Sequence, residues 1–286
     1  MGRVLAALIW LVTLLTVILF VSKRWWFPEN IAAHGFSIDS QFTITMLVVA
    51  FAFVAAQIGL GYTIWKYRAT PEDKKSRATY SHGNNRLEVL WTGITALIFI
   101  GLAIMGQRVW ASLHFQDAPN RSDNQPAYEI RVVSQQFQWN FHYPGKDKTF
   151  GHTDPKLIND GSQNFIGLDD ADPNSKDDII APTLVIPLNE PVRLVLRSRD
   201  VTHSLWIPNM RFKQDTVPGL EIPVHFMATK DGCYEIACAE LCGQLHYKMG
   251  AKMLVLPDAE HQALVSLSQP EFQKKRDEYL AKYNCK

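Results

Sequence analysis

Three long apolar stretches fill most of the first 106 residues, and they constrain the fold more than any other feature of the chain. They cover residues 4–21, 42–65 and 89–106, and none of them contains a charged residue. A helix needs about 20 apolar residues to cross a bilayer, whereas a helix in water has no need to be apolar on every side. The sequence therefore predicts a membrane anchor over residues 1–110, with three helical spans.

The first stretch has an alternative interpretation as a cleaved signal peptide. Its apolar part would be unusually long for a signal peptide, and residues 22–27 offer no small-residue cleavage site. We therefore expect the first helix to be retained in the protein.

Basic residues between the spans indicate which side of the membrane each loop occupies. The loop after the second span carries six of them: Lys66, Arg68, Lys74, Lys75, Arg77 and Arg86. The loop after the first span has only Lys23 and Arg24. Because basic loops stay in the cytoplasm, everything after residue 106 is expected to lie on the extracytoplasmic side.

The chain changes character after the third span. Residues 111–127 form a polar linker, and residues 128–257 contain many short apolar or alternating segments separated by Gly, Pro, Asn and Asp. This pattern is typical of a β-sandwich or a β-barrel. Residues 258–286 show a helical pattern that is interrupted at Pro270. We expect this tail to pack on the β domain or on a neighbouring subunit.

A group of potential metal ligands lies near the C-terminal end of the β domain. Within twelve residues, the group contains Cys238, Cys242, His246 and Met249. Thiolate, thioether and imidazole ligands together suit copper better than magnesium, calcium or manganese. Two thiolates four positions apart can bridge two copper ions, which then need a second imidazole and a second weak axial ligand. His203 and the backbone carbonyl of Glu240 are the best candidates for these two ligands.

Two other structures would use part of this group. A Cys238–Cys242 disulfide would leave the histidine and the methionine without a role. A zinc site could combine the two cysteines with His203 and His246, but it would have no use for Met249.

The spacing of these residues resembles a known family. The run from Cys238 to Met249 reads C-x-E-x-C-x3-H-x2-M, and His203 lies 35 positions before its first cysteine. It resembles the loop that holds the binuclear copper centre CuA in cytochrome c oxidase subunit II, and the membrane spans and an aromatic run match that family as well. The resemblance implies a cupredoxin-like Greek-key fold for residues 128–257. It also implies that the copper ligands are Cys238, Cys242, His203, His246, Met249 and the Glu240 carbonyl.

The resemblance also implies a function and a set of partners. The chain would be subunit II of a bacterial respiratory haem-copper oxidase, a multi-pass protein of the inner (plasma) membrane with a periplasmic C-terminal domain. CuA would accept electrons from cytochrome c and pass them to haem in subunit I, where oxygen reduction is coupled to proton pumping. Subunits I and III and the lipid bilayer are the expected partners, and the formal net charge of +1 gives no support to nucleic-acid binding. In the family, the Glu240 side chain binds a magnesium ion at the boundary with subunit I.

Three other protein classes share part of this pattern. Nitrous oxide reductase resembles it at the copper loop only and is soluble. Quinol oxidase subunit II shares the anchor and the β domain but lacks the copper ligands, all of which are present in this sequence. A copper-delivery or storage cupredoxin would have no use for Glu88 or for two spans that lead into the domain.

Glu88 opens the third span, three residues before Trp91. A carboxylate in the first turn of a helix is stabilised by the helix dipole and needs no further role. The run from Glu88 to Thr92 also resembles the family's Glu-x-x-Trp-Thr segment, whose Glu stands at the cytoplasmic mouth of a proton channel into subunit I. Because an ionisable group at a membrane boundary is a functional candidate, we expect Glu88 to have this channel role.

The aromatic run departs from the family at the point where electrons enter. The family reads Gln-Trp-x-Trp with the first Trp at the surface, whereas this chain has Phe137 in that position, followed by Gln138 and Trp139. The change resembles a branch of bacterial oxidases without a fused cytochrome c, whose donor is often a tethered or membrane-bound cytochrome. Residues two apart on a strand face the same side. We therefore expect Phe137 and Trp139 to serve electron uptake, with Trp139 in place of the missing surface Trp.

Several remaining features have no firm chemical assignment. Residues 145–180 form an Asp-rich insertion that is expected to be a solvated loop, with calcium binding or docking of a basic cytochrome as alternatives. Asp200 and Asp215 lie in motifs that match the family, and we expect them to support the ligands or to lie at an interface. Four cysteines are too few for a disulfide scaffold. Cys233 is expected to be a small buried strand residue, and Cys285 a tail thiol without an assigned role.

Overall fold

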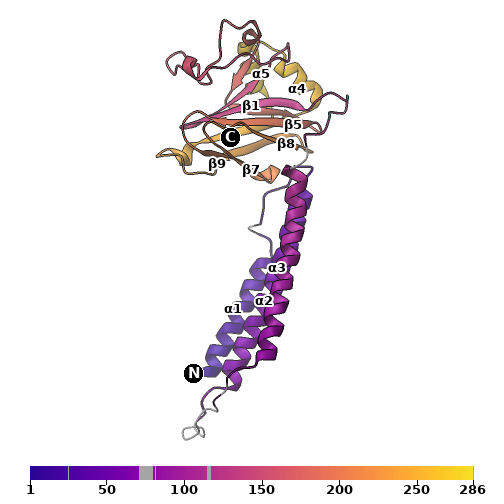
Figure 1. Ribbon diagram of the computed structural model, residues 1–286, viewed down its shortest axis with the longest axis vertical. Coiled ribbons are helices and arrows are strands. Elements are labelled where there is room, and N and C mark those ends of the chain that lie inside the picture. Colours follow the sequence, from indigo (N-terminus) through magenta and orange to yellow (C-terminus); the bar gives the residue numbers. More distant parts are fainter. Residues whose placement is uncertain (25, 71–79, 81, 115–116, 286) are drawn as a thin grey trace. The chain divides into compact units, whose positions relative to one another are not determined.

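The computed structural model divides the chain into two compact units, which are described separately (Figure 1). The described residues are 1–24, 26–70, 80, 82–114 and 117–285. The first unit is helical and consists of Met1–Trp26 and Ser37–Ala111. The second unit consists of Phe27–Phe36 and Ser112–Lys286, and it holds the whole β domain.

The helical unit contains three helices that are long and apolar enough to cross a membrane. They are α1 (Gly2–Val21), α2 (Gly35–Lys66) and α3 (Asn85–His114). Trp10 of α1 lies so close to Gly61 of α2 that a Cβ there would approach the indole nitrogen to 2.2 Å. Most apolar side chains of the three helices are exposed, as expected of surfaces that meet lipid or other subunits. The prediction of three helical spans is confirmed.

The β domain contains two five-stranded sheets. The first sheet has the order β3-β2-β1-β5-β8 and the second has the order β4-β10-β9-β6-β7. The strands of the first sheet are β1 (Tyr128–Gln135), β2 (Gln138–Tyr143), β3 (Ile179–Ala181), β5 (Pro191–Ser198) and β8 (Ile222–Met227). The strands of the second sheet are β4 (Thr183–Pro187), β6 (His203–Ile207), β7 (Phe212–Thr216), β9 (Gly232–Cys238) and β10 (Gly250–Leu256).

The strand pairing shows why this domain is a Greek key and not a meander. Strand β1 pairs in parallel with β5, and β4 pairs in parallel with β10, whereas the other pairs are antiparallel. Parallel neighbours require connections that leave the sheet and return, so the chain passes repeatedly between the two sheets. The predicted all-β, cupredoxin-like domain is confirmed.

Alternating apolar residues form the core of the domain. On β5, Val192, Leu194 and Leu196 have no exposed surface, and they belong to one buried cluster with Leu205 and Leu254 of the second sheet. Period-two burial of this kind results from side chains that point alternately to the two faces of a strand.

The C-terminal tail forms two helices that pack on the β domain (Figure 1). They are α4 (Asp258–Val265) and α5 (Gln269–Lys282). Ser268 and Glu271 form a capping box that fixes the start of α5. Phe272 is fully buried, and its ring centroid lies 5.8 Å from that of Tyr143 on β2.

The segment between α1 and α2 belongs to the β domain, although the predicted division placed it with the anchor. The backbone N–H of Ile31 donates to the carbonyl of Asn209 at 3.0 Å, and the N–H of Thr229 donates to the carbonyl of Ile31 at 2.7 Å. Ile31 has no exposed surface. The segment packs there because its backbone forms hydrogen bonds with backbone groups at the edge of the domain, which would otherwise lack partners.

The acidic insertion is more ordered than a solvated loop. It contains the short helices η2 (Pro155–Leu157) and η3 (Pro173–Lys176). The carboxylate of Asp178 is buried and lies 2.6 Å from the His142 ring of β2. Elsewhere in the insertion, Asp160 pairs with Arg199, which follows β5, at 2.8 Å. The insertion is therefore attached to the sheet at both sides.

Cys233 and Cys285 form a disulfide, with their Cα atoms 5.7 Å apart. The expectation that Cys233 is a plain buried strand residue, and Cys285 a thiol without a role, is therefore wrong. The bond joins β9 to the end of the tail. An even number of cysteines on the extracytoplasmic side was a signal for such a bond, but the sequence alone did not place the tail next to β9.

Candidate metal centre

The potential metal ligands come together at one end of the second sheet. His203 begins β6, Cys238 ends β9, and the remaining groups lie in the loop between β9 and β10. Strands β6 and β9 are neighbours, with Leu205 opposite Cys238. The backbone N–H of Cys238 donates to the carbonyl of Met249 at 3.0 Å, which closes the loop at its base. Strand pairing therefore positions both sides of the site.

The six predicted donor groups surround one small volume. The two thiol sulfurs of Cys238 and Cys242 lie 3.9 Å apart. The Nδ1 atom of His203 lies 4.0 Å from the sulfur of Cys238, and the Nδ1 atom of His246 lies 3.5 Å from the sulfur of Cys242. The Sδ atom of Met249 is 3.8 Å from the Cys242 sulfur, and the carbonyl oxygen of Glu240 is 3.3 Å from the Cys238 sulfur.

Cys238 and Cys242 are free thiols and are not joined by a disulfide. A sulfur–sulfur bond is about 2.05 Å long, whereas these atoms are separated by 3.9 Å. The donor atoms of His203, Cys238 and Cys242 all lie within 4.8 Å of one another, as in a group that could hold a metal ion. Two sulfurs, two imidazole nitrogens, a thioether and a carbonyl make a donor set that fits soft metal ions.

The potential ligands differ in their exposure to solvent. His203 is fully buried and Met249 is 2% exposed, whereas His246 is partly exposed. The Glu240 side chain is exposed, although its carbonyl faces Cys238. The His203 side of the site is therefore enclosed by protein, and the His246 side is closer to the surface.

Asp200 fixes the orientation of His203. Its Oδ1 atom lies 2.8 Å from Nε2 of His203, so that Nε2–H can donate and Nδ1 is left free to face Cys238. Oδ2 of Asp200 also accepts the backbone N–H of Gln136 at 2.6 Å. A carboxylate that holds the far nitrogen of a ligand histidine sets its tautomer and raises its basicity. Asp215, by contrast, lies on β7 beside Lys213, at 3.7 Å.

Electrostatics favour one thiolate over the other. Burial opposes ionisation of Cys238, but hydrogen bonds from His203 and from backbone groups lower the pKa of its thiol to about 6. Burial and the charge of Cys238 raise the pKa of the Cys242 thiol to about 11. For Asp200, burial is again outweighed by hydrogen bonds from His203 and from backbone N–H groups, which lower the pKa of the carboxyl. A second negative sulfur this close to Cys238 would be stabilised only by a cation beside the pair.

The aromatic run lies against the metal loop, but not as the strand pattern predicts. Strand β2 begins at Gln138, and Phe137 lies in the preceding turn, so Phe137 and Trp139 are not on one face of an extended strand. Trp139 is 1% exposed, and its ring meets that of His203 edge-on at 6.2 Å. Phe137 is partly exposed. Trp139 therefore does not provide a surface docking point.

The turn at Phe137 and the metal loop approach each other at Gly243. The side-chain amide of Gln136 donates to the carbonyl of Cys242. Gly243 has a positive φ of 135°, and a Cβ there would lie 2.9 Å from the Phe137 ring. The approach therefore requires glycine. It is a contact that spacing alone did not reveal.

Glu88 belongs to the helical unit and is not part of this group. It lies in the first turn of α3 and is exposed. The side-chain oxygen of Asn84 accepts the backbone N–H groups of Arg86 and Leu87, at 3.1 and 3.3 Å, and so caps the same turn.

Comparison with known proteins gives consistent matches along the chain. Residues 128–255 match the family described as cytochrome c oxidase subunit II, periplasmic domain, and residues 27–109 match its transmembrane domain. The alternative cytochrome c oxidase subunit 2 of Bradyrhizobium diazoefficiens is 32% identical over 267 residues, which cover 90% of this chain and 89% of that protein. Cytochrome c oxidase subunit 2 of Synechocystis is 26% identical over 289 residues, with 94% and 83% covered.

A solved structure is also similar to the β domain. It is the periplasmic domain of cytochrome oxidase subunit II of Bradyrhizobium japonicum, which is 25% identical, with a TM-score of 0.38. The match covers 54% of this chain and 98% of that structure.

Proposed function

This chain belongs to the cytochrome c oxidase subunit II family, and from that premise we propose that its metal group is the binuclear copper centre CuA of a bacterial haem-copper oxidase. The matches to both parts of the family and the three apolar helices show a membrane-anchored oxidase subunit with an extracytoplasmic C-terminal domain. The single observation that carries the proposal is the pair of free thiols, 3.9 Å apart, with an imidazole nitrogen beside each sulfur.

In this proposal six groups hold the copper ions. They are the side chains of Cys238, Cys242, His203, His246 and Met249 and the backbone carbonyl of Glu240. When bound, the copper pair would take up one electron at a time from cytochrome c, or from a membrane-bound cytochrome, and release it toward haem in subunit I. Oxygen reduction and the coupled proton pumping would occur in the larger complex, in the bacterial inner membrane.

The protein holds the potential ligands in position through its own contacts. The loop is closed by backbone hydrogen bonds, and Asp200 holds His203 in a single orientation. Burial of His203 and Met249 keeps water from that side. Ligands that are already in place change little when charge changes, which lowers the cost of electron transfer.

Copper content and electron paramagnetic resonance of the full chain test the proposal. The full-length protein, purified with copper, should bind two copper ions and show a purple, mixed-valence spectrum in which one unpaired electron is shared by two copper nuclei. A chain that holds one zinc ion, or one copper ion with a blue mononuclear spectrum, would contradict the assignment.

We also propose that Phe137 is the surface group at which electrons arrive, and that Trp139 acts behind it. Support comes from the contact of the Phe137 turn with the metal loop and from the edge-on ring of Trp139 at His203. Phe137→Ala should then slow cytochrome oxidation and leave the copper spectrum unchanged. Steady-state oxidation of the donor measures this, and unchanged kinetics in the variant would remove Phe137 from the path.

Two further roles rest on the family alone. We propose that Glu88 stands at the mouth of a proton channel, and that the exposed carboxylate of Glu240 binds magnesium at the boundary with subunit I. Glu88→Gln should slow turnover of the assembled oxidase without changing electron uptake by the copper centre. Metal analysis of Glu240→Gln in the assembled oxidase should show loss of magnesium with copper retained, and magnesium at the wild-type level would exclude the second role.

A further inference from the structure

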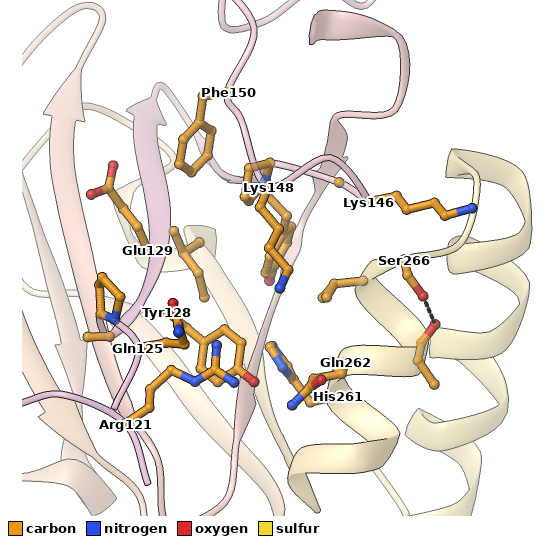
Figure 2. Close-up of a pocket in the computed structure, with 18 residues that line it drawn as sticks. Arg121, Gln125, Tyr128, Glu129, Lys146, Lys148, Phe150, His261, Gln262 and Ser266 are labelled. Carbon is orange, nitrogen blue, oxygen red and sulfur yellow. Dashed lines mark hydrogen bonds between the residues drawn. The ribbon is translucent and has the colours of Figure 1, made fainter. Parts of the chain in front are cut away.

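The β domain contains a cavity of about 570 Å³ in which no residue of the metal group takes part. It lies between the start of β1, the turn that follows β2, and α4 (Figure 2). Its volume falls in the range of sites that bind small molecules, about 300–1,000 Å³. The electron-transfer function gives this cavity no role.

The body of the cavity is apolar and aromatic. Tyr143 and Ile130 of the two neighbouring strands are buried in its wall, and Phe150 and Tyr128 present their rings to it. Surfaces of this kind favour an apolar part of a ligand.

Two cations face this apolar space. Arg121 has a side chain that is only 10% exposed, its guanidinium lies 3.8 Å from the centre of the Tyr128 ring, and its Nη2 atom pairs with Asp123 at 2.8 Å. The Nε atom of Arg121 is buried and has no hydrogen-bond partner among the described residues. Lys148 extends into the cavity from the turn after β2 (Figure 2), and it forms no ion pair within the described part of the chain.

Glu129, the acidic residue of the wall, does not pair with Arg121 or Lys148. Glu129 pairs with Arg193, and its other oxygen lies 3.7 Å from Arg131. Arg121 already pairs with Asp123, and the Asp258 carboxylate accepts the Tyr128 hydroxyl at 2.8 Å. Of these two cations of the wall, Lys148 therefore supplies the positive charge that is left without an ion pair among the described residues.

His261 adds a buried polar group at the base of the cavity. Its side chain is 2% exposed, and its ring meets that of Tyr128 edge-on at 4.9 Å. Although the backbone of Val185 lies close by, neither ring nitrogen has a partner within hydrogen-bonding geometry among the described residues. Burial lowers the pKa of His261 to about 4, so the ring is neutral and can donate one hydrogen bond. A buried polar group without a partner costs free energy, which a ligand would recover.

The backbone segments that carry Arg121 and Lys148 are held by contacts within the domain. The N–H of Arg121 donates to the carbonyl of Gln125 at 2.8 Å, and the N–H of Ser122 donates to the carboxylate of Glu190 at 2.9 Å. In the turn that carries Lys148, a Cβ at Gly145, whose φ is 63°, would lie 2.1 Å from the carbonyl oxygen of Asp177. Such preorganisation reduces the entropy lost on binding.

We propose that this cavity binds a small organic anion, that is, a carboxylate or phosphate group attached to an apolar ring or short chain. The anionic group would face Lys148 and Arg121, with a hydrogen bond from His261, and the apolar part would lie against Tyr128 and Phe150. The same chemistry is available from a soluble organic acid or from an acidic lipid.

Fluorine NMR of the full chain in phosphatidylcholine nanodiscs tests the site with para-(trifluoromethyl)benzoate as the probe. The uncharged para-(trifluoromethyl)benzyl alcohol has the same ring and serves as the matched probe. The benzoate should bind saturably, and the alcohol about tenfold more weakly, as expected for loss of one charge-assisted contact. Absence of saturable benzoate binding would overturn the proposal.

Three variants locate the binding. Lys148→Met keeps most of the side-chain length, removes the charge, and should weaken binding of the benzoate about tenfold but not that of the alcohol. Lys156→Met removes an exposed lysine of the same insertion that does not line the cavity, and it should change nothing. Ala263→Trp places a large ring in the cavity from an exposed position on α4, and it should abolish binding of both probes. Equal benzoate affinity in all three variants would overturn the proposal, and an unchanged copper spectrum shows that each is folded.

The lipid composition of the nanodiscs distinguishes the two sources. If phosphatidylglycerol displaces the benzoate from the wild type, the natural anion is a lipid, whereas an unchanged benzoate affinity assigns the site to a soluble acid. Displacement that persists in Ala263→Trp would place the probe elsewhere and overturn the assignment to this cavity.

Discussion

Strand β9 contributes one cysteine to each of two cysteine pairs, and only one of these pairs forms a disulfide. Cys233 is bonded to Cys285 at the end of the tail, whereas Cys238, five positions later, faces Cys242 as a free thiol at 3.9 Å. Both pairs belong to the same domain and are close enough for covalent or metal-mediated contact. The difference therefore does not come from compartment or from residue type.

The geometry of the strand explains the difference. Side chains an odd number of positions apart point to opposite faces of a strand, so Cys233 and Cys238 are separated by the sheet. On the inner face, Cys238 meets His203 and the loop that carries Cys242. On the outer face, Cys233 meets the tail after α5. Cys238 therefore lies among imidazoles with which it could share a metal ion, whereas Cys233 meets the thiol of Cys285 and is bonded to it.

Serine in place of a free thiol should give the largest effect. Cys238→Ser or Cys242→Ser leaves one sulfur, which does not bridge two metal ions as a pair does, so the mixed-valence spectrum should be lost and the copper content should fall. Metal analysis and paramagnetic resonance of the full chain measure both. The matched control is the double variant Cys233→Ser/Cys285→Ser, which should keep the spectrum. Equal loss in the control would mean that the two pairs are not independent.

Removal of the disulfide should act on stability and not on the metal. The bond closes a separation of 52 residues, and loop entropy predicts a loss of about 4 kcal/mol in the free energy of unfolding. Guanidinium unfolding of the copper-loaded chain, followed by tryptophan fluorescence, should show the loss in the Cys233→Ser/Cys285→Ser variant. Protease cleavage within α5 should become faster in that variant. An unchanged unfolding midpoint would show that packing of Phe272 alone holds the tail.

The contrast between the two pairs also shows what the sequence could predict. Four potential side-chain ligands lie within twelve residues of one another, so their spacing predicted a metal group. His203 could be added to it because of its spacing in the family. Cys285 lies 52 positions from its partner, and nothing local in the tail says which strand it meets. That pairing is set by the path of the chain in the folded domain and not by a local sequence pattern.

Long-range structure also explains why the positions of some residues differ from those that the sequence pattern predicts. The period-two rule predicted one shared face for Phe137 and Trp139, but the turn ends only at Gln138, and Trp139 is packed in the core. Residues around Ile31 lie between two membrane helices in sequence, yet they complete the β domain through hydrogen bonds to distant loops. Such long-range backbone pairing leaves no periodic signal in a short segment.

A smaller effect should come from the carboxylate that orients His203. Asp200→Asn keeps the shape of the side chain but replaces an acceptor oxygen and removes the charge that holds Nε2–H. Changes at such positions typically lower metal affinity about 10–100-fold. Asp215→Asn is the matched control, because Asp215 lies beside Lys213 and its substitution should have no effect on the metal. Competition with a copper chelator measures both affinities, and equal values for the two variants would contradict the role of Asp200.

The smallest expected effect is at Met249, and it separates holding the metal from tuning it. Met249 is 2% exposed and its sulfur lies 3.8 Å from that of Cys242, so Met249→Leu removes a weak ligand while nearly conserving volume. Such swaps usually cost less than about 1.5 kcal/mol of stability, and axial ligands set the potential of a copper site more than its affinity. The variant should therefore keep its copper and its fold but change its reduction potential, measured by redox titration of the visible spectrum. Met253→Leu, the same change at a fully buried position on β10 outside the ligand group, should leave the potential unaltered. If Met249→Leu lost its copper while His203→Ala retained it, the thioether would hold the metal more strongly than the imidazole. Copper binding would then depend more on the loop after Cys242 than on strand β6.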